Sequence, residues 1–127
     1  MGTIIRILFC FTIVTASLEA FQWLSYSDAL EVQKKTNKPI MLDVMRDTCH
    51  YCLKMEKNVF QDPEMARWLE ERFIPAQINL DNEKLPLDEQ IMLTPTFFFL
   101  DENGKILKKI PGSWNIQDFK DLTKGIK

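Results

Sequence analysis

The chain has 127 residues, which is room for one domain built around a single hydrophobic core. With 46% hydrophobic and 27% charged residues, four Gly and six Pro, the composition excludes an intrinsically disordered chain. The net charge is −2 and the lysines are scattered along the chain, which excludes the clustered basic surface of a nucleic-acid-binding protein.

The first sixteen residues predict a signal peptide. One early cation, Arg6, precedes the apolar run 7–14, and small residues follow it. We expect cleavage after Ala16, or as late as Ala20, so that residues 1–16 form the signal. A membrane anchor is the alternative, but the apolar run is well short of the roughly 20 residues that span a bilayer.

Only one pair of cysteines then remains in the mature domain, residues 21–127. Cleavage removes Cys10, and the bulky Phe9 before it argues against a lipid attachment site. Cys49 and Cys52 remain as a single C-x-x-C pair. Export also implies a compartment in which disulfides persist, such as a bacterial periplasm or its eukaryotic equivalent.

The domain is expected to begin with a helix, a strand and a second helix. Polar residues and an early Glu at 27–31 predict a helix that ends near Asn37. Residues 40–45 form an apolar run of strand length, interrupted only by Asp43, which indicates a buried central strand that carries an acid. After a polar turn, a helix is expected over residues 49–59.

A third helix and a second strand follow. Because a proline comes directly after the capping residue Asp62, we expect a helix over residues 63–73. Residues 74–80 predict a strand, and residues 82–92 predict a polar connection with one helical turn after Pro86.

The last elements are a hairpin and a closing helix. Residues 94–100 predict a strand entered through Pro95, and the turn 101–104 leads into an antiparallel strand over residues 105–110. Asn115 can cap the last helix. This order of elements is typical of an α/β fold in which helices flank both faces of a mixed central sheet.

The C-x-x-C pair lies where the first strand passes into a helix. Free N–H groups and the dipole at a helix N-terminus stabilise a thiolate, so we expect Cys49 to be the nucleophile, with a pKa below that of a free thiol. Cys52, one turn in and shielded, is the expected resolving thiol. The alternatives are a permanent structural disulfide and half of a zinc site. A structural zinc site needs four ligands, and the mature domain offers only the two cysteines and His50.

With these features the chain resembles the thioredoxin superfamily from about Phe21 to its end, and in particular its exported members. The matching features are Asp43 six residues before Cys49, the Thr94-Pro95-Thr96 proline loop, the Asn103-Gly104 turn and Gly112. The chain departs from the common pattern at Thr48, where thioredoxins usually have Trp, and at Gln77, where many have Lys. The resemblance implies the thioredoxin fold and a redox-active pair.

The resemblance also implies roles for residues around the pair. Asp43 would assist proton transfer at Cys52, since burial raises the pKa of an acid; its alternative is an acid satisfied by nearby backbone groups. Pro95 would follow a cis peptide bond beside the cysteines, which is an uncommon feature. The backbone of Thr94 would then pair with an extended segment of the substrate.

The two residues between the cysteines are expected to tune the redox pair. A partly protonated His50 would favour the thiolate of Cys49 and make the protein more oxidising. An exposed histidine with little influence is the alternative. Tyr51 is expected to supply an apolar contact beside the sulfurs. Trp23, Trp68 and the run Phe97–Phe99 are expected to be core residues rather than ligand-binding residues.

Together these features predict a monomeric, exported thiol-disulfide oxidoreductase that exchanges disulfides with proteins. It would need no cofactor beyond the Cys49–Cys52 disulfide, and an electron donor or acceptor would restore the pair. Both directions of electron flow stay open. Two other functions also stay open: a copper-binding module that uses Cys49, His50 and Cys52, and a chaperone or assembly subunit.

Overall fold

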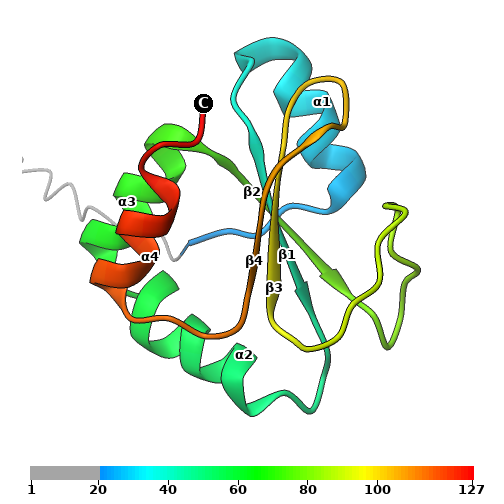
Figure 1. Ribbon diagram of the computed structural model, residues 1–127. Coiled ribbons are helices and arrows are strands. Elements are labelled where there is room, and N and C mark those ends of the chain that lie inside the picture. Colours follow the sequence, from blue (N-terminus) through cyan, green and yellow to red (C-terminus); the bar gives the residue numbers. More distant parts are fainter. Residues whose placement is uncertain (1–20) are drawn as a thin grey trace, which may run out of the picture.

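A computed structural model describes residues 21–127 of the protein. The predicted signal peptide, its cleavage sites and Cys10 lie outside these residues. The path of the chain from the first helix to the last is shown in Figure 1.

A four-stranded mixed sheet forms the centre of the described region, with the strand order β2-β1-β3-β4. The strands are β1 (Ile40–Met45), β2 (Ile74–Asn79), β3 (Thr96–Leu100) and β4 (Ile106–Pro111). Strand β1 pairs in parallel with β2 and antiparallel with β3, and β3 pairs antiparallel with β4. The predicted hairpin is therefore confirmed.

Helices cover both faces of this sheet. They are α1 (Tyr26–Thr36), α2 (His50–Met55), the π-helix η1 (Glu56–Phe60), α3 (Pro63–Arg72) and α4 (Ile116–Thr123). Helix α1 lies on one face, while α2, α3 and α4 lie on the other (Figure 1). The predicted α/β class, a thioredoxin fold with a mixed sheet between two helical layers, is confirmed.

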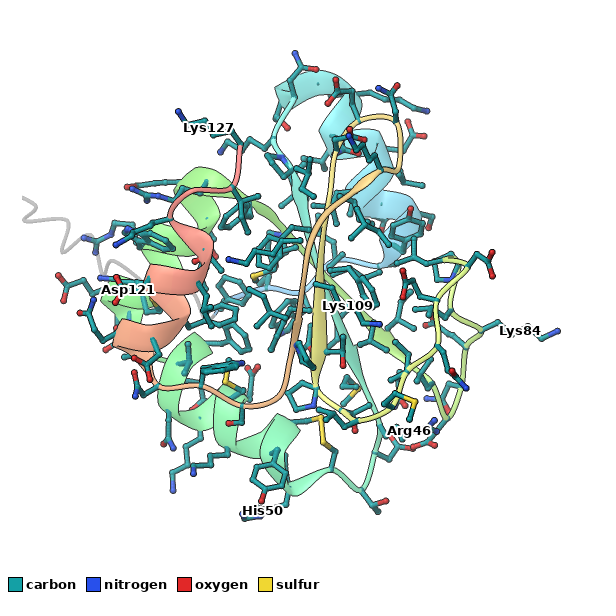
Figure 2. The ribbon with its side chains drawn as sticks, in the orientation of Figure 1. Arg46, His50, Lys84, Lys109, Asp121 and Lys127 are labelled. Atoms are coloured by element: carbon teal, nitrogen blue, oxygen red, sulfur yellow. A yellow bond between two sulfur atoms is a disulfide. The ribbon has the colours of Figure 1, made fainter. Side chains whose placement is uncertain are left out.

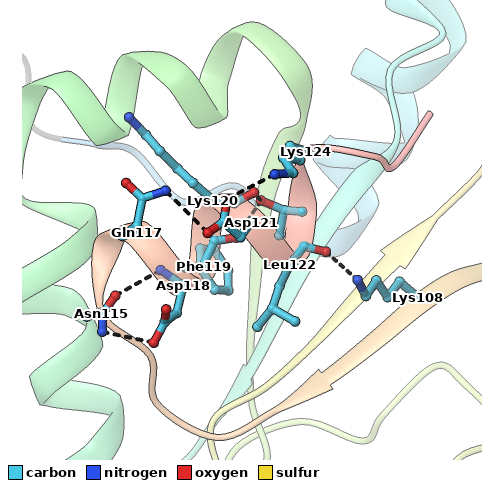
Figure 3. Close-up of polar contacts among 10 residues, drawn as sticks. Lys108, Asn115, Gln117, Asp118, Phe119, Lys120, Asp121, Leu122 and Lys124 are labelled. Carbon is cyan, nitrogen blue, oxygen red and sulfur yellow. Dashed lines mark hydrogen bonds and ion pairs between the residues drawn. The ribbon is translucent and has the colours of Figure 1, made fainter.

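Side-chain caps fix where three of the helices begin. Ser25, Asp62 and Asn115 each accept a hydrogen bond from the backbone N–H three residues further on. Figure 3 shows the Asn115 cap at the start of α4 and, near its end, Lys108 Nζ donating to the Leu122 carbonyl. The last helix is thereby tied both to its own first turn and to β4.

The alternation of side chains along β1 determines which residues face the helix that follows the C-x-x-C pair. Ile40, Leu42 and Val44 enter the core beneath α1, whereas Met41 enters the core beneath α2, α3 and α4. Because successive residues of a strand point to opposite faces, Asp43 shares the face of Met41. The acid of the central strand therefore points towards the helix that follows the C-x-x-C pair.

The expected core residues divide between the interior and its edge. The three phenylalanines Phe97–Phe99 are fully buried, with alternate rings on opposite faces of the sheet. Trp23 and Trp68 are partly buried and pack against the larger cluster.

The structure differs from the expected elements at three places. The connection 82–92 consists of turns and bends, so the helical turn predicted after Pro86 is wrong. Leu85, Leu87 and Ile91 from this connection pack against the core on the α1 face, and this burial outweighs local helical preference.

The second difference is the helix predicted over residues 49–59, which ends as an α-helix at Met55 and continues as η1. The wider turn closes with the Gln61 N–H donating to the Glu56 carbonyl at 2.9 Å. It places Val59 and Phe60 in the core.

The third difference is the start of β3, which begins at Thr96 and leaves the proline loop outside the strand.

Candidate active site

Cys49 and Cys52 form a disulfide at the start of α2, with their Cα atoms 5.2 Å apart. Cys49 is the N-cap residue of this helix and has an extended backbone. The backbone N–H of Cys52 donates to Cys49 Sγ at 3.1 Å. A thiolate formed at Cys49 on reduction would find this donor already in place, and a helix N-terminus favours negative charge.

The proline loop approaches the same sulfur from the opposite side. The Thr94–Pro95 peptide bond is cis. The Thr94 hydroxyl donates to Cys49 Sγ at 3.3 Å, and the Thr94 carbonyl oxygen lies 3.4 Å from that sulfur. Although 45 residues separate them in sequence, Thr94 thus contacts Cys49 through both its side chain and its backbone.

The end of β4 holds this loop in position. The backbone N–H of Gly112 donates to the Pro95 carbonyl at 2.8 Å. Gly112 has φ +94°, in the region that glycine occupies without a steric penalty. At the other side of the loop, the Thr96 hydroxyl donates to the Leu93 carbonyl at 2.7 Å. The loop is therefore fixed on both sides of the cis bond.

Asp43 lies behind the pair as a buried acid with an incomplete set of hydrogen bonds. Only 4% of the residue is exposed. Gln77 Nε2 donates to Asp43 Oδ2 at 3.0 Å, whereas Oδ1 is buried without a hydrogen-bond partner. Desolvation raises the pKa of Asp43 to about 7, partly offset by the Gln77 hydrogen bond, and the charge of Glu56 adds to the rise.

A cavity of about 160 Å³ connects this acid with the disulfide. Its lining includes Asp43, Cys49, Cys52, Glu56 and Gln77. An acid that titrates near neutral pH and shares a cavity with a cysteine can exchange a proton with that cysteine, directly or through one water molecule.

The two sulfur-bearing residues differ in exposure from the sequence-based expectation. Cys49 is 8% exposed, and Cys52, which was expected to be shielded, is only partly buried. Both cysteines border the cavity, but Thr94 contacts Cys49 through its hydroxyl and its carbonyl oxygen and so covers that sulfur.

The residues between the cysteines lie on the surface. Figure 2 shows His50 at the outer end of the molecule, where α2 begins. Its ring meets the Tyr51 ring edge to face, with centroids 5.6 Å apart, and Tyr51 is 58% exposed. Both residues are thus exposed to solvent in the first turn of α2, between the two cysteines in sequence.

Glu56 is the residue of this site that sequence reasoning missed. It lies four residues after Cys52, and residues at this spacing share one face of a helix. That spacing is the signal that could have identified it. The side chain borders the cavity and accepts a hydrogen bond at 3.1 Å from Trp23 Nε1.

Two further findings concern the described part of the chain. Within residues 21–127, no three His, Cys, Asp or Glu side chains gather in a way that could hold a metal ion. Over the same residues, no helix combines the length and apolar content needed to cross a membrane.

Comparison with known proteins matches residues 26–127 to a family described as a thioredoxin-like domain. The disulfide bond reductase DsbH of Chlamydia pneumoniae is 28% identical over 102 residues, covering 70% of this chain and 61% of DsbH. Spermatogenesis-associated protein 20 of Mus musculus is 40% identical over 67 residues, covering 53% of this chain and 8% of that protein. The solution structure of a thioredoxin from Thermus thermophilus has a TM-score of 0.66 and 26% identity, covering 84% of this chain and 87% of that one.

The chain thus spans only a small part of the spermatogenesis-associated relative and less than two thirds of DsbH. The match to the family, in contrast, extends over every helix and strand from α1 to α4. The chain therefore belongs to the thioredoxin-like domain family.

Proposed function

We propose that the protein is an exported thiol-disulfide oxidoreductase that acts as a monomer on protein substrates through its Cys49-His50-Tyr51-Cys52 motif. The observation that carries the proposal is the Cys49–Cys52 disulfide between the cis-proline loop and a cavity containing Asp43. A purely structural disulfide would need neither of these neighbours.

In the reaction that we propose, the Cys49 thiolate attacks a disulfide of the substrate. One substrate sulfur leaves as a thiolate, and Cys49 stays bound to the other in a mixed disulfide. Cys52 then loses its proton and attacks Cys49 Sγ, which releases the second substrate thiolate and re-forms the internal disulfide. Two electrons pass from the cysteine pair to the substrate, and a second thiol-disulfide partner must return them.

Asp43 is the proposed acceptor of the Cys52 proton. Its unpartnered Oδ1 and its place in the same cavity as Cys52 support this role. An acid with a pKa of about 7 can accept and release a proton at the pH at which such an enzyme works.

Thr94 and Pro95 are the proposed substrate-binding residues, and His50 and Tyr51 the proposed tuning residues. The contacts of Thr94 with Cys49 support the first role, because a substrate segment that pairs with this backbone would bring its disulfide to the sulfur. The position of His50 and Tyr51 between the two cysteines in sequence supports the second.

We take reduction of the substrate as the physiological direction, because the relative DsbH is named a disulfide bond reductase. The reduction potential of the pair tests this choice. A value near about −270 mV would agree with a reductant, and a value near about −120 mV would indicate an oxidant instead.

Insulin reduction tests the proposed activity. With dithiothreitol as electron source, the wild-type protein should accelerate the precipitation of reduced insulin chains, and Cys49→Ser should lose this acceleration. The double variant Cys49→Ser/Cys52→Ser serves as the control for a cysteine-independent chaperone effect. Equal acceleration by the double variant would contradict the proposal, and slower precipitation with both the wild type and the double variant would favour the chaperone.

Export is proposed on the composition of residues 1–16 and on the need for a compartment in which the disulfide persists. N-terminal sequencing of the protein made from its full reading frame in a bacterial host tests it. The expected mature sequence begins after Ala16 or as late as after Ala20. An intact N-terminus on a cytosolic protein would contradict export.

A further inference from the structure

The cavity beside the disulfide contains a second carboxyl group, Glu56, in addition to Asp43. Glu56 lies at the start of η1 and is partly buried. Its charge acts on Asp43, because like charges at short range disfavour a second ionisation. The position of the Glu56 carboxylate therefore bears on the proton affinity of Asp43.

An indole group from a distant part of the sequence holds this carboxylate. Trp23 Nε1 donates to Glu56 Oε2 at 3.1 Å across 33 residues of sequence. Among the described residues 21–127, Trp23 is the one hydrogen-bond partner of the Glu56 side chain. Without it, the carboxylate would be free to turn towards solvent.

The Trp23 ring is itself well anchored. It meets the rings of Phe21 and Phe60 edge to face, at centroid distances of 4.8 and 4.9 Å. Its neighbour Leu24 adds to the edge of the sheet: the Leu24 N–H donates to the Pro75 carbonyl, and the Leu24 carbonyl accepts from Gln77, both at 3.0 Å. The segment before α1 thus presents the indole N–H at a fixed place.

The other charged groups around the cavity have partners of their own. Arg46 lies 3.5 Å from Asp81, and Asp47 accepts a hydrogen bond from Asn79. Arg46 and Asp47 both line the cavity, but both side chains are engaged at its outer rim. Glu56 is therefore the charged group whose orientation depends on Trp23.

We propose that Trp23 is a positioning residue of the redox site, which holds the Glu56 carboxylate in the cavity and so sets the pH at which Asp43 exchanges its proton. This inference rests on the proposed function, in which Asp43 accepts the proton of Cys52. It makes the segment before α1 part of the redox machinery and assigns Glu56 the role of a fixed negative charge.

A carboxyl ¹³C NMR titration of the oxidised protein tests the inference without any substrate. Glu56→Gln keeps a hydrogen-bond acceptor for Trp23 and removes the charge, so the Asp43 midpoint should move to lower pH. A move of about 0.5 pH would give roughly threefold more ionised Asp43 at pH 6. Trp23→Phe keeps an aromatic ring and removes the N–H, so it should move the midpoint in the same direction by less.

Two comparisons separate positioning from packing. Trp23→Phe should add no further shift in the Glu56→Gln background, because no charge is left to position. Trp68→Phe is the matched control, since Trp68 also packs at the edge of this core but stacks with Arg72 at 4.0 Å, and it should leave Asp43 unchanged. An unchanged Asp43 midpoint in either Trp23→Phe or Glu56→Gln would overturn the inference.

The wild-type protein gives a second readout that needs no folded Trp23 variant. The indole ¹H–¹⁵N signal of Trp23 should shift with pH as Asp43 titrates, because the indole is bonded to the carboxylate that acts on Asp43, and this shift should vanish in Glu56→Gln. A pH-independent indole signal in the wild type would overturn the inference. Failure of the wild type to reduce insulin would instead contradict the proposed function, and the titrations would stand apart from it.

Discussion

Asp43 is the residue whose environment says most about the site. An acid that is 4% exposed, with one oxygen lacking a hydrogen-bond partner, makes the folded protein less stable when it is ionised. The fold tolerates this arrangement in the middle of its central strand. A carboxyl group whose pKa is about 7 suits proton exchange at neutral pH better than structural support.

The first prediction concerns stability against pH. Folding raises the pKa of Asp43 from 3.8 to about 7, so the native state binds more protons than the unfolded state between these values. The contribution of Asp43 to the free energy of unfolding is therefore fully present below about pH 4 and is lost as the pH rises through 7. At about 1.4 kcal/mol per pH unit, the loss amounts to roughly 4 kcal/mol.

Asp43→Asn removes this ionisation and keeps the shape of the side chain. Urea unfolding of the oxidised variant should therefore give a higher free energy of unfolding than the wild type at pH 8, by roughly 2–4 kcal/mol. At pH 4 the two proteins should differ little. A difference that stays constant across this range would show that the ionisation of Asp43 is not what separates them.

Most residues of the candidate site could be predicted because local patterns determine them. The spacing of Asp43 from Cys49 and the Thr94-Pro95-Thr96 loop before the third strand can be read from the sequence, and the resemblance to the thioredoxin superfamily then predicts their roles. The bond between Trp23 and Glu56 could not be predicted in this way. It depends on a single bridge of the N-terminal segment to β2 and on the start of a π-helix, and neither leaves a periodic pattern.

At the scale of elements, the site depends on how α2 ends and how the proline loop is held. The sequence indicated a helix over residues 49–59 but not its widening after Met55, because the wider turn is stabilised by the burial of Val59 and Phe60. The same reason explains the connection 82–92, where tertiary contacts replace the expected helical turn. Tertiary packing decided both cases.

The second prediction concerns the hold of β4 on the proline loop. Gly112→Ala would force a Cβ into a backbone at φ +94°, although the nearest atom to that Cβ lies 4.0 Å away. The expected cost is about 1–2 kcal/mol from the backbone conformation alone, measured by urea unfolding. Because Gly112 holds Pro95, insulin reduction should fall as well.

Gly104→Ala is the matched control for this prediction. Gly104 has φ +77° in the hairpin turn, and a Cβ there meets nothing within 4 Å. The control should lose similar stability and keep its activity. Equal losses of activity in the two variants would show that Gly112 acts only through global stability.

At the scale of the whole molecule, the two oxidation states should differ in stability. The disulfide closes a loop with a sequence separation of only 3, so it restricts the unfolded chain modestly. The chain-entropy relation gives about 2 kcal/mol for such a loop. The third prediction is that the reduced protein unfolds at a lower urea concentration than the oxidised one, and that Cys49→Ser/Cys52→Ser resembles the reduced form. Coincident unfolding of both oxidation states would contradict it.

The whole molecule also brings Cys49, Asp43 and the cis-proline loop together from three separate segments of the chain: the start of α2, the strand β1 and the loop before β3. The central claim depends on this convergence, since we propose from it that Cys49 is the sulfur that attacks the substrate. Cys52 is the more exposed of the two cysteines, so the test must also detect attack on the substrate by Cys52.

Capture of a mixed disulfide tests that claim most directly. Reduced Cys52→Ser is incubated with a disulfide-bonded protein substrate such as insulin, and the complex is mapped by mass spectrometry. The account predicts a stable adduct through Cys49, and little adduct from Cys49→Ser under the same conditions. Efficient capture through Cys52 in the Cys49→Ser variant, together with no adduct through Cys49 in the Cys52→Ser variant, would contradict it.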